Sequence, residues 1–178
     1  MQKLILLICF FMTTTVAFSQ EKAAVPAQDN PLSTFNKRAY GQMKDWLLRS
    51  AEKVPEQHYN FRPTEAVRSF GQIVGHVADV QYMFCSLARG EKNPGLKIEQ
   101  TKTTKADLIA ALKDAFVYCD QAYDSMTDAS GIQMVKLARS DTPKLSVLTV
   151  NLSHSALHYG NLVTYMRLKN IVPPSSER

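Results

Sequence analysis

Apolar residues recur every three or four positions in four separate stretches of this chain. That spacing places them along one side of an α-helix, and it predicts helices over residues 33–53, 70–90, 104–126 and 143–169. No stretch shows the strict alternation of apolar and polar residues that is typical of a half-buried β-strand. The pattern therefore predicts an all-α four-helix bundle in a single domain, without an internal repeat.

Local signals mark the ends of two of these helices. Ser69 and Gln72 have the spacing of a capping box at the start of the second helix. Gly90 is typical of the position just after a last helical turn. Pro143 is a favoured first residue for the fourth helix, and Thr142 is its predicted cap.

The segments between the helices are predicted to be loops. Residues 56–63 are rich in aromatic residues and are expected to pack across one end of the bundle. Residues 91–102 contain an Asn-Pro-Gly turn signal. Residues 127–142 form a longer loop with room for a short extended or helical piece.

The N-terminal segment differs from the rest of the chain. Residues 1–19 combine a short basic start, a short apolar run and small residues at Ala17 and Ser19. These features are typical of a secretory signal peptide, with cleavage predicted before Gln20. The apolar run is shorter than the roughly 20 residues that a membrane-spanning helix needs.

Cleavage would leave a polar linker over residues 20–30 and a bundle domain over residues 31–176. The mature protein is therefore predicted to be secreted or periplasmic, without stable insertion into a membrane. The full chain has 178 residues, 45% of them hydrophobic, which is enough for one domain with a core. The net charge is +5, but basic residues are scattered among acidic ones, so nucleic-acid binding is not expected.

Two cysteines, Cys85 and Cys119, remain after cleavage because Cys9 lies in the signal peptide. An oxidising compartment would allow them to form one disulfide bond. Two inert, buried thiols are the alternative, since the sequence does not give the distance between them.

The fourth predicted helix carries a row of polar side chains at spacings of three and four. This row consists of Asn151, His154, His158, Asn161 and Tyr165. Polar groups on a buried face are costly unless they are paired, and two imidazoles one turn apart can hold one ion. A His-x-x-x-His pair alone is a weak signal, and hydrogen-bonded core histidines are the alternative. The absence of a Glu beside His154 excludes the His-Glu-x-x-His pattern of zinc proteases.

A third histidine, His76, lies on the buried side of the second predicted helix. Three histidines that leave one coordination position open would be suited to a catalytic metal centre. His76, His154 and His158 are therefore the candidate metal ligands.

Several motifs together resemble the DinB-like superfamily of metal-binding four-helix bundles. The matching segments are Gly75–Asp79, His154–His158, Tyr59–Pro63, Val67–Phe70 and Leu162–Ser175. The resemblance spans residues 31–176. It implies that His76, His154 and His158 bind a divalent transition metal, with zinc or nickel as the leading candidates. Many relatives have Gln where this chain has Asn161.

The resemblance leaves the reaction open. Members of the wider family transfer low-molecular-weight thiols such as bacillithiol or mycothiol, or use them as isomerase cofactors, which implies a small-molecule substrate. A metal-dependent hydrolase would suit an exported protein better, because those thiols are mainly cytosolic. A non-catalytic, stress-associated metal-binding bundle and a purely structural bundle remain alternatives. The family also suggests a homodimer.

Five other residues have candidate roles at the site. Asp79 is a possible carboxylate partner of a metal-bound histidine or a solvated surface residue. Arg62, Arg68 and Tyr159 are candidates for contact with an anionic substrate, and each also has a structural interpretation. His58 is interpreted as a loop residue, with a proton donor near the metal as the alternative.

Overall fold

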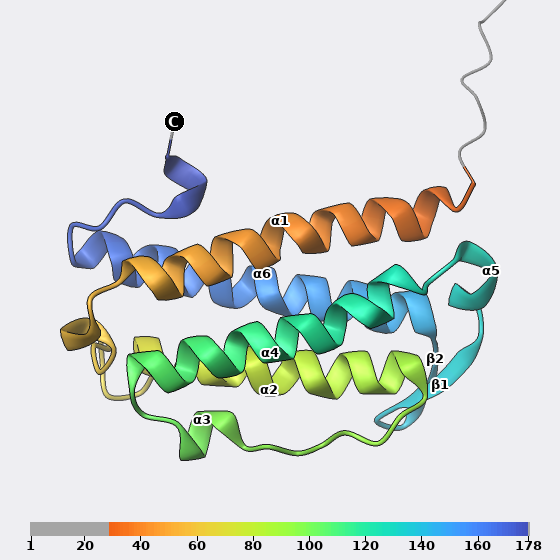
Figure 1. Cartoon of the computed structure of the whole chain (residues 1–178), viewed down its shortest axis with the longest axis horizontal. Coiled ribbons are helices and arrows are strands. Elements are labelled where there is room, and N and C mark those ends of the chain that lie inside the picture. Colours follow the sequence, from red (N-terminus) through yellow and green to blue (C-terminus); the bar gives the residue numbers. More distant parts are fainter. Residues whose placement is uncertain (1–28, 178) are drawn as a thin grey trace, which may run out of the picture.

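Four long helices form the body of the computed structural model, which describes residues 29–177 (Figure 1). They are α1 (Pro31–Lys53), α2 (Phe70–Arg89), α4 (Lys105–Asp124) and α6 (Lys144–Leu168). Helix α2 packs against α4 and α6, and α1 packs against α4 and α6. Helices α1 and α6 run in one direction, and α2 and α4 run in the opposite direction. The predicted all-α four-helix bundle is confirmed. The predicted signal peptide and most of the predicted linker lie outside the described residues.

The connection between α2 and α4 returns along the length of the bundle, because these two helices run in the same direction. It contains the short helix α3 (Ile98–Thr101), which packs on α2. The prediction of a loop was therefore wrong over α3. Its Ile98 side chain is buried, and Lys97 precedes it with a positive φ of 54°. This helix is held by contacts from α2, which the local sequence does not reveal.

The capping predictions for α2 are confirmed. The Ser69 hydroxyl accepts a hydrogen bond from the Gln72 backbone N–H, and the Gln72 side chain accepts one from the Ser69 N–H. Gly90 follows the last turn with a φ of 74°, a conformation that glycine adopts without strain.

The predicted start of the fourth helix was wrong by one residue, and so was its cap. Helix α6 begins at Lys144, and Pro143 pairs instead with Met134 in a short β-hairpin. The hairpin consists of β1 (Met134–Leu137) and β2 (Ser140–Pro143), and it follows the short helix α5 (Asp128–Gly131). Thr142 belongs to β2, so its hydroxyl donates to Ser140 O rather than capping α6. The expected short extended or helical pieces are both present.

Two short 3₁₀ helices, η1 (Glu56–His58) and η2 (Pro174–Ser176), complete the fold. A disulfide bond joins Cys85 of α2 to Cys119 of α4, with the two Cα atoms 5.2 Å apart. The two helices are thereby linked covalently inside the bundle, which resolves the two alternatives for these cysteines. None of the described helices combines the length and apolar character needed to cross a membrane.

Candidate metal centre

Three histidine rings from two helices meet between α2 and α6. Nε2 of His154 lies 3.2 Å from Nε2 of His76 and 3.2 Å from Nε2 of His158. One ring nitrogen from each residue can be chosen so that all three lie within 4.8 Å of one another. The fold thus brings His76 next to His154 and His158, from which it is far removed in the sequence. A metal ion could be held between the three rings.

The two separations of 3.2 Å fit a bound ion better than a pair of hydrogen bonds. A tetrahedral metal with bonds of about 2.0–2.1 Å to nitrogen holds its ligand atoms about 3.3 Å apart. In contrast, Nε2 of His154 has one hydrogen or one lone pair, so it cannot form good hydrogen bonds to both neighbouring rings. Nδ1 of His154 is buried and has no hydrogen-bond partner. The cluster is therefore a poorly satisfied group of polar atoms in the absence of a ligand.

The protonation state of the rings also favours metal binding. Burial, followed by the neighbouring histidine and Arg68, lowers the pKa of His154 to about 4. Burial and the other two histidines lower the pKa of His158 to about 4. Burial and Arg68 also lower the pKa of His76, although Glu99 opposes this shift. The imidazoles are neutral near pH 7, which is the form that binds a metal.

Glu99 of α3 orients His76. One carboxylate oxygen lies 3.0 Å from Nδ1 of His76, and the other accepts a hydrogen bond of 2.7 Å from Nε of Arg68. An ionised carboxylate only accepts hydrogen bonds, so Nδ1 of His76 carries the proton and its Nε2 presents a lone pair to the cluster. A carboxylate on the outer nitrogen is the usual partner of a metal-binding histidine.

Asp79 was interpreted either as the carboxylate partner of a metal-bound histidine or as a solvated surface residue, and its carboxylate binds the backbone of α3 rather than His76. It accepts hydrogen bonds from the backbone N–H groups of Ile98 and Glu99, at 2.8 and 2.9 Å. Gly75 makes the close approach of α3 possible, because a Cβ there would lie 2.8 Å from Cα of Glu99. Asp79 and Gly75 therefore place Glu99 beside His76.

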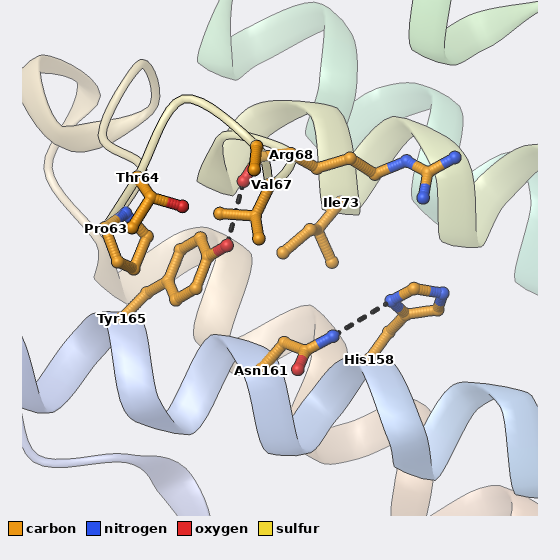
Figure 2. A pocket seen from close by; sticks show the side chains of 9 residues that line it. Pro63, Thr64, Val67, Arg68, Ile73, His158, Asn161 and Tyr165 are labelled. Carbon is orange, nitrogen blue, oxygen red and sulfur yellow. Dashed lines mark hydrogen bonds between the residues drawn. The ribbon is translucent and has the colours of Figure 1, made fainter.

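Asn161 lies one turn after His158, and its amide nitrogen is 3.5 Å from Nδ1 of His158 (Figure 2). That distance is at the limit of a hydrogen bond. Binding of a metal at Nε2 of His158 requires a proton on Nδ1. The Asn161 amide must then turn its oxygen toward the ring, and such a turn exchanges only the two ends of the amide.

A cavity of about 450 Å³ opens beside the cluster. Its lining includes His158 and Asn161 of α6, together with Arg68 and Val67 from the segment before α2 (Figure 2). The cavity gives a small molecule access to one side of the histidine cluster. Of the three residues considered for contact with an anion, only Arg68 lines it.

The other sequence candidates lie elsewhere. Arg62 forms an ion pair with Glu65 and lines a separate depression, which Glu99 also lines. Tyr159 stacks on Trp46 and accepts a hydrogen bond from the Ser175 backbone N–H, so it fastens the C-terminal segment. His58 lies in η1 and does not line the cavity beside His158. The structural interpretations therefore hold for Arg62 and Tyr159.

The fold and the histidine cluster define a four-helix bundle with a candidate metal centre between two of its helices. A sequence profile of the DinB superfamily matches residues 39–162, which is more than half of the chain and includes all three histidines. The chain belongs to the DinB superfamily.

Solved structures with the same fold agree with this assignment. A DinB-like protein from Bacillus subtilis is 19% identical, with a TM-score of 0.65 over 81% of this chain and 99% of that one. A DinB-like protein from Bacillus cereus is 11% identical, with a TM-score of 0.69 over 78% and 93%. A mycothiol-dependent maleylpyruvate isomerase is 14% identical, with a TM-score of 0.63 over 73% and 60%. No curated protein matches the sequence significantly.

Proposed function

We propose that this protein binds one divalent transition metal ion, zinc or nickel, through Nε2 of His76, His154 and His158. The observation that carries the proposal is the convergence of three neutral imidazoles, with Glu99 on the outer nitrogen of His76. The matching family profile adds support, and so do the 3.2 Å separations of Nε2 of His154 from Nε2 of the other two rings.

We further propose that the centre activates a small molecule bound in the adjoining cavity. A divalent metal ion with an open position lowers the pKa of a bound thiol or water, which makes either a nucleophile near neutral pH. The chain's own residues have simpler tasks. Glu99 keeps the proton on Nδ1 of His76, Asn161 contacts His158, and the cavity beside His158 admits the substrate.

Thiol transfer is the first candidate reaction, and it is supported by the similar fold of a mycothiol-dependent isomerase. Hydrolysis of an ester or amide is the second. It is favoured by the proposed export of the protein, because low-molecular-weight thiols are mainly cytosolic. The disulfide bond between Cys85 and Cys119 supports export, since such bonds persist in oxidising compartments.

Elemental analysis of the mature protein, purified without added metal, tests the binding step. Close to one equivalent of zinc or nickel is expected. Less than about 0.2 equivalents, both as purified and after incubation with excess metal, would reject a site of the affinity usual for three protein ligands. His154→Ala should lose the metal because it removes the central ring of the cluster.

A second experiment tests the reaction. Metal-loaded protein is assayed with an electrophile plus a thiol, and separately with ester and amide substrates. Turnover that survives in His154→Ala would exclude a mechanism centred on the metal. Full metal occupancy without any turnover would favour the non-catalytic, stress-associated alternative. Sedimentation velocity of the same sample tests the proposed homodimer.

A further inference from the structure

The cavity beside His158 has an unequal distribution of charge. Arg68 is the one formally charged residue in its lining, and no carboxylate lines it. The remaining walls are largely apolar and include Val67, Ile73 and the ring of Tyr165. A ligand that fits both parts has an apolar body and one anionic group.

Arg68 is held so that part of its guanidinium stays available. Its Nε donates to Glu99, and its backbone oxygen accepts a hydrogen bond of 2.9 Å from the Tyr165 hydroxyl. Within residues 29–177, neither Nη group of Arg68 forms a hydrogen bond. The two Nη groups together form an edge that matches the two oxygens of a carboxylate.

The direction of the side chain links Arg68 to the histidine cluster. In Figure 2 it runs along α2, past Ile73, toward the end of the cavity where the ring of His158 lies. Glu99 also bridges Arg68 to His76, with one oxygen on each residue. A ligand held by Arg68 therefore lies next to the proposed metal centre.

We propose that Arg68 determines substrate specificity by binding the carboxylate of a small organic acid whose apolar part occupies the cavity. The position of this acid relative to the reacting group rests on the proposed function, but its binding to Arg68 does not. The cavity of about 450 Å³ lies within the range of roughly 300–1,000 Å³ that is typical of small-molecule sites.

The test compares two probes of nearly equal shape, phenylacetate and its neutral analogue phenylacetamide. Isothermal titration calorimetry is carried out on the mature protein, both zinc-loaded and zinc-free, with zinc removed by the neutral chelator 1,10-phenanthroline followed by dialysis. The variants are Arg68→Gln, Arg68→Lys and Arg62→Gln. Arg62→Gln is the matched control, because Arg62 lines a separate depression and not the cavity beside His158.

In the zinc-free protein, phenylacetate should bind at least about tenfold more tightly than phenylacetamide, as expected for two hydrogen bonds between charged groups. Arg68→Gln should remove that preference and leave phenylacetamide binding unchanged, whereas Arg62→Gln should retain it. Arg68→Lys should retain part of it, because the charge remains but the paired donors are lost. Circular dichroism and the thermal midpoint of each variant show whether it is folded.

Three results would overturn the proposal. They are a carboxylate preference that persists in folded Arg68→Gln, no binding of phenylacetate at millimolar concentration, and a preference that exists only with zinc and does not depend on Arg68. The zinc content of every sample is also measured, so that a failure of carboxylate binding can be distinguished from a failure of the proposed metal binding. A protein that binds no zinc but retains the Arg68-dependent preference rejects the metal function alone.

Discussion

Helices α2 and α6 carry two polar clusters that differ in how their hydrogen bonds are satisfied. In the first, the Gln81 amide donates to Ser155 Oγ at 2.9 Å and accepts from the Asn151 amide at 2.8 Å. In the second, the rings of His76, His154 and His158 point their nitrogens at one another. Both clusters lie on the same pair of helices, so packing alone does not explain the difference.

The comparison separates a structural cluster from a candidate binding site. Gln81, Asn151 and Ser155 are at most 1% exposed, and their side chains find partners within the bundle, except for Oδ1 of Asn151. The histidine cluster borders a cavity, and Nε2 of His154 faces two other ring nitrogens although it can form only one hydrogen bond. Polar groups that satisfy each other contribute to stability, whereas polar groups that converge without doing so create a place for a ligand.

The largest expected effect is the response to metal removal. Zinc at 100 times its dissociation constant should stabilise the wild-type protein by about 2.7 kcal/mol. Chelation should therefore lower the thermal midpoint of the wild-type protein and leave that of His154→Ala unchanged. Differential scanning calorimetry with and without chelator measures both. Equal responses in the two proteins would show that the three rings do not form a stabilising metal site.

Glu99→Gln is the next expected effect, and it tests how the histidine cluster is supported. The substitution replaces the carboxylate on Nδ1 of His76 with a weaker acceptor. Zinc affinity should fall by about 10- to 100-fold, as is usual when the outer partner of a metal-binding histidine is changed. Competition with a chromogenic chelator measures the affinity.

Glu91→Gln is the control for Glu99→Gln. Glu91 is also a paired carboxylate, but its partners are Arg89 and Tyr118. The zinc affinity of Glu91→Gln should equal that of the wild-type protein. If both variants lose affinity equally, the effect comes from net charge and Glu99 has no specific role.

Gln81→Leu should give the opposite pattern. The Gln81 side chain is fully buried. Its replacement removes the donor to the Ser155 hydroxyl and one acceptor of the Asn151 amide group. The free energy of unfolding should fall by about 1–3 kcal/mol, while zinc affinity stays the same. Urea denaturation of the metal-free protein, together with chelator competition, measures the two quantities. A large loss of zinc affinity would mean that the two clusters are coupled.

The four long helices and the histidines that α2 and α6 contribute to the site follow from the sequence, because helical periodicity and the His-x-x-x-His spacing are local properties. The contribution of α3 does not. The capping box at Ser69 and Gln72 is local as well, and it was predicted correctly. The role of Glu99 was not predicted. It depends on a crossover that returns along the bundle, on an approach allowed by Gly75 and on hydrogen bonds from Asp79.

The same distinction explains why the sequence left two interpretations of Asp79 open and why Arg68 was not separated from Arg62. Sequence spacing placed Asp79 near His76 but gave no information about α3, which occupies that carboxylate. Arg62 and Arg68 both lie in the segment before α2, and the sequence gives no reason to prefer one of them. In the structure, Glu65 pairs with Arg62 and Glu99 pairs with Arg68. A tertiary contact decides which of them faces the cavity.

The expected effect that is smallest near neutral pH is a dependence of stability on pH that arises from the histidine cluster alone. In the metal-free folded protein, burial lowers the pKa of His154 and of His158 to about 4, against an ordinary value of 6.5. Between these values the unfolded chain binds more protons than the folded one. The free energy of unfolding should therefore fall as the pH falls from about 6.5 toward 4, and this contribution should be constant above that range.

Urea denaturation at a series of pH values tests this dependence. His154→Gln should flatten the slope over that range, because it removes one of the histidines that gain protons on unfolding. Gln81→Leu should lower the whole curve and leave its slope unchanged, since the Gln81 cluster contains no group that titrates there. If His154→Gln retains the wild-type slope, protons taken up elsewhere cause it, and the histidine cluster is not the pH-sensitive one of the two.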